Sequence, residues 1–254
     1  MRSEFKYMIR YDDLEELREA MLSYVDIDSH TPETENFGQY TVRSIYFDTY
    51  KLDYYYEKRM GIKLRKKIRI RSYNTLPYYK DQNPPVFLEV KRKTDNFISK
   101  NRSKVDWNDL EELLKTGDIE RYIHGDGSNG AYDDASRFLY HYKARSLQPA
   151  VLVTYEREAF FSKFDPYFRV SLDKNIRSLA FPAVKDLFAT EGLNQSFYDY
   201  FVLEIKFTGA FPSWMTDILF RFKYTREAVS KYKICLDYYK VWETRNRLQM
   251  YSLT

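Results

Sequence analysis

Cysteine is almost absent from this chain of 254 residues, which carries only Cys235. A single thiol excludes an intramolecular disulfide framework. The chain opens with MRSEFKYMIRYDD, which has no apolar signal core, and no later apolar run is long enough to cross a membrane. These absences predict a cytoplasmic protein without a membrane segment; whether it needs a membrane-protein partner stays open.

Common phosphate loops and metal-ligand spacings are missing as well. The sequence contains neither G-x-x-x-x-G-K-[ST] nor G-x-G-x-x-G, so nucleotide phosphates are not held in a P-loop or a Rossmann crevice. His30, His124 and His141 share no metal-ligand spacing, and one cysteine supports neither a zinc site nor a Cys/His dyad. Any phosphate chemistry must therefore use side chains.

Glycine and proline are scarce, at 8 each, whereas there are 25 tyrosines and 18 phenylalanines. Aromatic residues favour strands, and 44% hydrophobic residues suffice for a real core. The formal net charge of +4 would not by itself attract nucleic acid, so the cations matter through where they cluster. We expect one antiparallel, strand-rich domain over residues 1–254.

Residues 63–73, KLRKKIRIRSY, alternate between charged and apolar side chains as a strand with one face in a core must. One face carries Lys63, Arg65, Lys67, Arg69 and Arg71, and the other carries Leu64, Ile68 and Ile70, interrupted only by Lys66. Successive cations about 6.6 Å apart repel by roughly 2.5 kcal/mol at an effective dielectric near 20. An anion is expected opposite them, although a solvated sheet face is the alternative.

The same alternation recurs along the chain. Further strands are predicted around residues 5–9 and over 39–48, 86–93, 97–105, 151–161, 167–173 and 201–207, with helices after residue 12 and near 109–122, 135–144, 213–222 and 230–242. Their charged faces add Glu4, Lys6, Glu89, Lys91, Lys93, Lys100, Arg102, Lys104, Arg157, Arg169, Glu204 and Lys206. Cations therefore far outnumber carboxylates, which is unusual for an ordinary solvated sheet.

Closure of this sheet would bring the charged faces together. An α+β fold with a closed antiparallel β-barrel and helices packed outside would line a polar lumen with cations, and such a lumen suits phosphate chains. The carboxylates are then best explained by a divalent cation, magnesium or manganese, that bridges them to phosphate. Other interpretations stay open for some of these residues. The side chains of Lys6, Lys93 and Lys104 could be solvated, Glu204 could be only a salt-bridge partner of Lys206, and Tyr155 could be a core residue.

A set of short motifs resembles a known family in order and spacing. They are SIYFDT (44–49), IRIRSY (68–73), FLEVKRK (87–93), SKNRSK (99–104), YER (155–157), FRVSLD (168–173), LEIKF (203–207) and SKY (230–232), with Lys6-Tyr7 before them. This order is similar to that of the polyphosphate polymerase domain of the vacuolar transporter chaperone (VTC) complex, within the triphosphate tunnel metalloenzyme, or CYTH-like, superfamily. The chain resembles its stand-alone bacterial versions.

The resemblance implies a tunnel of eight antiparallel strands and a role for each matching residue. It implies that Lys6, Arg69, Arg71, Lys91, Arg157, Arg169 and Lys231 hold phosphates and that Glu204 holds the metal. Taken with the charged faces, the full prediction is Arg69, Arg71, Lys91, Arg157 and Arg169 as catalytic; Lys6, Arg59, Arg65, Lys67, Lys100, Arg102, Tyr155, Lys206, Ser230 and Lys231 as substrate-binding; and Glu204, Glu4 and Glu89 as metal ligands. The expected cofactor is manganese or magnesium.

Three functions remain open from the sequence. The first is a polyphosphate polymerase that moves the γ-phosphate of ATP onto a growing chain, with nucleoside triphosphate and polyphosphate or pyrophosphate as ligands. The second is a tripolyphosphatase or nucleoside triphosphatase that uses water instead. The third is a non-catalytic polyphosphate or nucleic-acid binder. Nucleic acid is not expected, because the aromatic residues mostly occupy the parity opposite to the cations.

Overall fold

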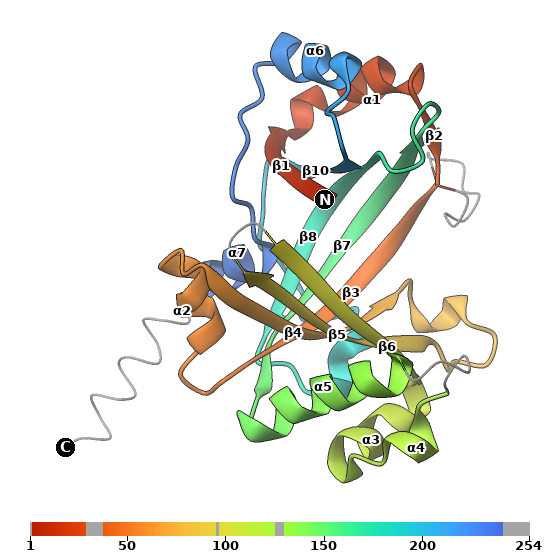
Figure 1. Cartoon of the computed structure of the whole chain (residues 1–254), viewed down its shortest axis with the longest axis vertical. Coiled ribbons are helices and arrows are strands. Elements are labelled where there is room, and N and C mark those ends of the chain that lie inside the picture. The colour runs from red at the N-terminus through yellow and green to blue at the C-terminus, as the bar shows by residue number, and fades with distance from the viewer. Residues whose placement is uncertain (1, 29–37, 95–96, 125–129, 241–254) are drawn as a thin grey trace. The chain divides into compact units, whose positions relative to one another are not determined.

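The computed structural model describes residues 2–28, 38–94, 97–124 and 130–240 (Figure 1). Its strands are β1 (Arg2–Arg10), β2 (Val25–Ile27), β3 (Gln39–Asp48), β4 (Leu64–Tyr73), β5 (Pro85–Thr94), β6 (Phe97–Asp106), β7 (Gln148–Ser162), β8 (Arg169–Ala180), β9 (Asn194–Gln195) and β10 (Tyr200–Thr208). The eight longer strands lie where alternation predicted them. The short β2 and β9 were not predicted.

The α-helices are α1 (Leu14–Leu22), α2 (Asp53–Arg59), α3 (Leu110–Thr116), α4 (Ile119–Tyr122), α5 (Gly130–Ala144), α6 (Ser213–Arg221) and α7 (Lys231–Tyr238). Short 3-10 turns are η1 (Tyr11–Asp13), η2 (Leu76–Tyr78), η3 (Trp107–Asp109) and η4 (Val184–Phe188). None of the helices in the described ranges combines the length and the apolar character needed to cross a membrane. His30 and the end of the predicted helix 230–242 lie outside the described residues.

Two helices differ from the prediction for local reasons. The predicted helix 109–122 is divided, because Gly117 adopts the left-handed conformation (φ 79°) that ends α3. Helix α2 was not predicted. It begins where the Asp48 carboxylate accepts hydrogen bonds from the backbone N–H groups of Tyr54 and Tyr55, both at 3.0 Å, so one side chain satisfies two of the donors that a helix start leaves without a partner.

The hydrogen-bonded strand order is β1-β10-β8-β7-β3-β4-β5-β6, with β2 beside β7 and β9 beside β8. The fold is α+β and the ladders β1–β10, β10–β8, β3–β4, β4–β5 and β5–β6 are antiparallel, as expected. The predicted closure is wrong: no ladder joins β1 to β6 among the described residues, so the sheet is open. Alternation specifies two faces for each strand but not which strands pair at the ends.

Both terminal strands have non-strand partners on their outer edges. The backbone N–H of Arg102 on β6 donates to the Asp134 carboxylate of α5 at 2.8 Å. The backbone carbonyl of Lys6 on β1 accepts from the N–H of Glu227 at 2.9 Å. A backbone group that is satisfied in this way does not require a neighbouring strand.

The chain forms two compact units, which we describe separately. Unit 1 contains Met1–Thr41, Tyr155–Arg177 and Gln195–Lys231, and unit 2 contains Val42–Thr154, Ser178–Asn194 and Tyr232–Thr254. In unit 1, the apolar face of β10 (Phe201, Leu203, Ile205 and Phe207) is buried in one cluster with residues of α1 and α6. Tyr24 and Trp214 stack at its margin with ring centroids 4.7 Å apart.

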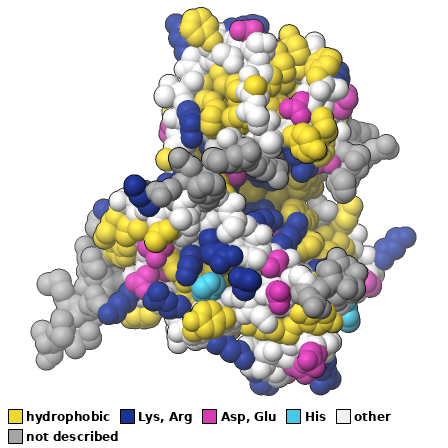
Figure 2. Space-filling view, viewed as in Figure 1, with side chains coloured by type: hydrophobic (Ala, Val, Ile, Leu, Met, Phe, Trp, Pro, Cys, Tyr) yellow, Lys and Arg dark blue, Asp and Glu magenta, His cyan; other side chains and the backbone are white. Residues whose placement is uncertain are grey.

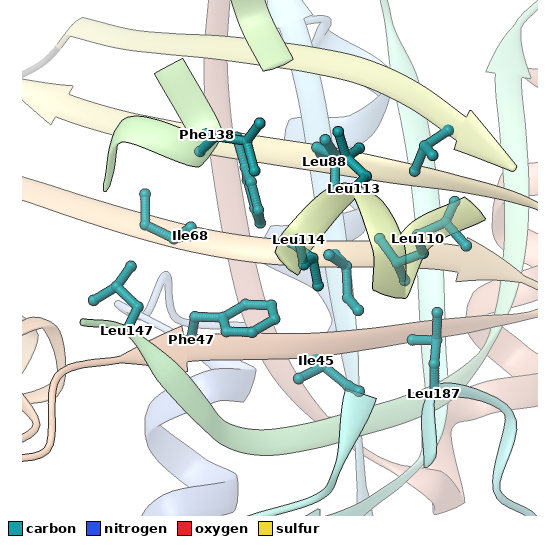
Figure 3. Packing of buried hydrophobic residues seen from close by; sticks show 14 of the residues in the cluster. Ile45, Phe47, Ile68, Leu88, Leu110, Leu113, Leu114, Phe138, Leu147 and Leu187 are labelled. Atoms are coloured by element: carbon teal, nitrogen blue, oxygen red, sulfur yellow. The ribbon is translucent and has the colours of Figure 1, made fainter. Parts of the chain in front are cut away.

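Unit 2 buries the apolar faces of β3, β4 and β5 beneath α3 and α5 (Figure 3). Ile68 and Leu88 come from neighbouring strands, and Leu113 and Phe138 come from the two helices. The Phe138 ring meets the Phe47 ring edge-on, with centroids 6.0 Å apart. The apolar parity of residues 63–73 is therefore a core face, as predicted, and the cations lie on the opposite face of β4.

Replacing Phe138 with alanine should lower the free energy of unfolding by about 3–5 kcal/mol, because it leaves a cavity in the core of unit 2. Urea denaturation measures this change. Tyr140→Ala on the same helix is the control, since Tyr140 is 67% exposed and its loss should cost less than about 0.5 kcal/mol. Equal effects of the two substitutions would contradict the packing.

Candidate functional site

Strands β4, β5 and β6 carry a cationic face in unit 2, which we define as Arg65, Lys67, Arg69, Arg71, Lys91, Lys100 and Arg102. The register places Lys67 opposite Lys91, and Lys91 opposite Lys100. Three lysines thus lie in a row across three strands, where neighbouring strands are about 4.8 Å apart. Like charges in directly opposite positions are destabilising, so this row points to an anionic ligand.

Glu89 is the buried carboxylate of the cationic face. Its side chain is 1% exposed, and its register partners are Arg69 and Arg102. Arg69 Nε donates to Glu89 Oε2 at 2.7 Å, Lys100 Nζ lies 2.6 Å from Oε1, and Arg102 Nε lies 3.4 Å from Oε1. Three cations therefore share one anion, which leaves an excess of positive charge.

Burial by itself would raise the pKa of Glu89, but Arg69, Arg71 and Lys100 outweigh it and hold that pKa well below its usual range. Glu89 is thus ionised at neutral pH. Its Oε1 is buried and accepts no aligned hydrogen bond within the described part of the chain, despite the ion pair with Lys100. An oxygen that keeps this acceptor capacity suits a hard divalent cation.

Aromatic and hydroxyl groups orient the arginines of the cationic face. Arg69 Nη1 donates to the Tyr46 hydroxyl at 2.9 Å, and Arg71 Nε donates to Ser44 Oγ at 3.0 Å. Arg102 lies 3.6 Å from the Phe87 ring centroid. Tyr46 and Ser44 belong to SIYFDT, but the sequence reasoning gave them no role, because nothing in one strand shows which hydroxyl meets a guanidinium on the next.

Unit 1 carries a second charged face on β1 and β10. The register places Lys6 opposite Glu204 and Glu4 opposite Lys206, so opposite charges face each other across the ladder. Lys6 Nζ lies 2.9 Å from Glu4 Oε1 and 3.2 Å from Glu204 Oε2, and Lys206 pairs with the other oxygen of Glu204. One ammonium group therefore bridges two carboxylates, which marks a position that favours positive charge.

The pKa values of these groups follow from their neighbours. Burial opposes ionisation of Glu204, but Lys206, Lys6 and Arg157 hold its pKa well below the usual range. Burial also lowers the pKa of Lys6, yet two carboxylates outweigh it and the pKa is raised. Burial wins at Lys206, whose pKa is lowered although Glu204 opposes the shift. The two lysines differ in part because Lys6 lies within 3.2 Å of both glutamates, whereas the positive charge of Arg157 also lowers the pKa of Lys206.

Asp173 joins two predicted phosphate ligands and was itself left out of the predicted site. Its carboxylate accepts from Arg157 Nε at 2.6 Å and Nη2 at 2.8 Å, and from Lys231 Nζ at 2.5 Å. Lys231 also lies 4.7 Å from the Tyr155 ring centroid. Burial raises the pKa of Asp173, but Arg157 and Lys231 reverse the shift and lower it to about 2. Asp173 is the counterion that positions both cations.

Three predicted residues, Arg169, Ser230 and Arg59, have not yet been placed. Arg169 donates to Asp28 at 3.0 Å and lies 4.0 Å from the Phe161 ring centroid, so Asp28 is another partner that the sequence did not indicate. Ser230 is 4% exposed just before α7. Arg59 ends α2 rather than lying on a strand face. The predicted residues thus divide into a unit 2 group on α2 and β4 to β6 and a unit 1 group on β1, β7, β8, β10 and at the start of α7.

One further group could hold a metal ion. Ligand atoms of Asp106, Asp109 and His124 in unit 2 lie within 4.8 Å of one another. The sequence reasoning found no metal-ligand spacing for His124, because the chain between Asp109 and His124 forms α3 and α4 and returns. Carboxylate and imidazole are common ligands of divalent metals.

Residues 1–240 match the family model described as the VTC domain. The chain belongs to the VTC domain family. The resemblance drawn from SIYFDT, LEIKF and the other motifs is thus confirmed. Family membership supports an enzyme that acts on polyphosphate or nucleotide phosphates with a divalent metal.

Comparison with solved structures finds more distant similarity. The PH1819 protein of Pyrococcus horikoshii is 13% identical, with 93% of this chain and 99% of that chain covered and a TM-score of 0.46. A candidate adenylate cyclase of Bacillus halodurans is 14% identical, with 89% and 92% covered and a TM-score of 0.48. No curated protein sequence matches the chain.

Glu89→Gln should lower the free energy of unfolding by about 3–5 kcal/mol at pH 7, because it removes the one anion that three cations share. The ordinary pKa of Glu89 is 4.5 and the folded-state pKa is lower, so its stabilising contribution is present above pH 4.5 and is lost as the pH falls toward the folded value. The variant should therefore lose less stability than the wild type below pH 4.5.

Chemical denaturation between pH 7 and pH 2 tests both parts of this prediction. Glu111→Gln, on the exposed side of α3, is the matched control and should follow the wild type. Parallel pH curves for Glu89→Gln and the wild type would show that Glu89 is not the ionised centre of the cationic face.

Proposed function

We propose that this chain is a metal-dependent polyphosphate polymerase that transfers the γ-phosphate of ATP to a polyphosphate chain. The observation that carries the proposal is the row Lys67, Lys91 and Lys100 across β4, β5 and β6. Two like charges separated by the spacing of neighbouring strands, about 4.8 Å, would repel by about 3.5 kcal/mol at an effective dielectric near 20. A chain of phosphates supplies negative charge at a repeated spacing along such a row.

The roles of the residues follow from their contacts. Arg69, Arg71 and Lys91 bind and orient phosphate oxygens on the cationic face of unit 2, where Tyr46 and Ser44 already fix the guanidinium planes of the arginines. Arg157 and Lys231 are held by Asp173 in unit 1. Asp173 takes up part of their charge and leaves the remainder for phosphate.

The transfer needs no covalent enzyme intermediate. The terminal oxygen of the polyphosphate attacks the γ-phosphorus of ATP, the bond to the oxygen that bridges the β- and γ-phosphates breaks, and ADP leaves with that electron pair. Positioning and charge stabilisation by fixed cations carry most of such a reaction. The oriented arginines supply both without a reorganisation of the site.

Glu204 and Glu4 are the carboxylates that would hold the divalent ion in unit 1, because they already flank one positive charge, the Lys6 ammonium. Glu89 offers its Oε1 in unit 2. Magnesium or manganese bound by such oxygen ligands would neutralise part of the negative charge of the phosphates. Before it binds, Lys6 and Lys206 keep the Glu204 carboxylate ionised.

The deciding experiment incubates the pure chain with ATP and manganese and identifies the products. Long polyphosphate together with ADP supports the polymerase. Orthophosphate alone assigns the site to a triphosphatase with water as the attacking group, and no turnover with tight tripolyphosphate binding leaves a non-catalytic binder.

Lys91→Gln should weaken tripolyphosphate binding about tenfold, since it removes the middle charge of the lysine row. The free energy of unfolding should stay equal or rise, because repulsion across the strands is relieved. Isothermal titration calorimetry measures the affinity, and Lys80→Gln, at an exposed lysine outside the cationic face, is the matched control. A folded Lys91→Gln protein with wild-type affinity would refute the role of the row.

Glu204→Gln should abolish metal-stimulated turnover and leave metal-free tripolyphosphate binding unchanged or tighter. The substitution keeps the size and polarity of the side chain and removes the charge that repels phosphate and attracts a divalent ion. Product formation with and without manganese measures the effect. Glu19→Gln, an exposed residue of α1 in the same unit, should retain activity. Normal manganese stimulation in Glu204→Gln would exclude Glu204 as a metal ligand.

A further inference from the structure

Lys66 is the one charged residue on the apolar face of β4, and the cationic face described above does not explain it. The register places Lys66 opposite Arg92 on β5. Its backbone N–H lies 3.4 Å from Glu57 Oε2, but within the described chain its ammonium group makes neither a hydrogen bond nor an ion pair. Two cations therefore lie side by side on the face of the sheet that packs against α5.

Helix α5 and the residue that follows it add two basic residues to this pair. His141 and Arg145 are four positions apart, so they project from the same side of the chain at the end of α5. The pKa of His141 is lowered because burial disfavours the imidazolium and because Lys66, Arg92 and Arg145 repel it. The charges of all three cations thus act on one imidazole, and we call these four residues the α5 cluster. In Figure 2, Lys and Arg side chains gather around a histidine over this region.

Arg92 has hydrogen-bonding capacity that the described residues do not use. Its Nη2 donates to Asn101 Oδ1 at 2.7 Å, and Asn101 donates in turn to Asp134 Oδ1 at 2.6 Å. Its Nε is buried and has no acceptor in the described part of the molecule. A buried donor without an acceptor is unfavourable, and an oxyanion would supply the missing acceptor.

Nearby carboxylates do not neutralise the α5 cluster. Asp134 is engaged by Asn101 and by the backbone N–H of Arg102. Glu57 faces Lys66 and Arg145, yet burial raises its pKa more than these cations lower it. Although Glu57 and Asp53 lie nearby, none of the three cations forms an ion pair with a carboxylate within the described residues.

We infer that the α5 cluster is a second anion site, on the face of β4 and β5 opposite to the cationic face, and that it binds a phosphate group. The arginine forks match phosphate oxygens, the Lys66 ammonium adds a point charge, and the neutral imidazole can donate one hydrogen bond. The inference does not depend on the proposed function, because it uses none of the residues assigned there. Its ligand is either a free phosphate ion or one segment of a polyphosphate chain.

His141 is a local reporter for this site, because the sequence contains only 3 histidines. We would label the histidines of the full chain, assign His141 with the variant His141→Gln, and follow its ring signals by NMR. Orthophosphate, pyrophosphate and long polyphosphate are the probes. Saturable movement of the His141 signal is expected, together with a rise in its pKa, since a bound anion favours the imidazolium.

The variant Lys66→Gln with Arg145→Gln should weaken the probe response of His141 at least tenfold. Lys80→Gln with Lys185→Gln removes the same charge from exposed positions of unit 2 and should leave the response unchanged. If the first pair does not fold, Arg92→Lys keeps the charge, removes the fork and should still weaken binding. Lys91→Gln should not alter the response, which separates this site from the cationic face.

The probes distinguish the two ligand sources. Saturation by orthophosphate and pyrophosphate at similar concentrations identifies a free phosphate as sufficient, whereas saturation by polyphosphate alone identifies a chain segment. A His141 signal that does not saturate with any probe, or that responds equally in Lys66→Gln with Arg145→Gln, would overturn the inference.

Discussion

Each strand buries the side chains on one of its faces in a core, and this places the cations on the other face close to one another. Ile68 and Ile70 are completely buried, and each buried side chain of this size stabilises the fold by about 1.5–3 kcal/mol. A slip of β4 by one residue would expose both and bury Arg69 and Arg71 in their place. The burial of a few apolar residues therefore outweighs a cation repulsion of similar size for each pair, and this burial fixes which face of β4 carries the charges.

Buried carboxylates offset part of the positive charge of these faces. Glu89, Glu204 and Asp173 each contact more than one cation. A one-to-one pairing would leave nothing to attract phosphate, whereas cations with no carboxylate would repel one another without restraint. Sharing one anion among several cations keeps the side chains oriented and still leaves net positive charge. The arrangement in unit 1 repeats that in unit 2, although the strands and the residues differ.

The sequence predicted the strands well because alternation with period two is a local signal. It predicted the family from motifs whose residues are now seen to hold hydrogen-bonded positions, such as Ser44 beside Arg71. Edge pairing could not be predicted, since the partners of the outer strands are Asp134 and the backbone of Glu227. The counterions Asp28 and Asp173 were missed for a related reason: their partners lie 141 and 16 positions away and become neighbours only after the strands have paired.

The first strand has a consequence for the order of folding. Strand β1 forms its ladder with β10, so the pairing of Lys6 with Glu204 cannot form before β10 has been synthesised. Unit 1 is assembled from three separate stretches of chain, and no continuous fragment contains its core. Contacts between residues so far apart in sequence are slow to form and leave apolar strands exposed in the meantime. During synthesis at the ribosome, the edge of β1 that pairs with β10 must stay without its partner strand until nearly two hundred further residues have emerged, and an unpaired strand edge can pair with another chain.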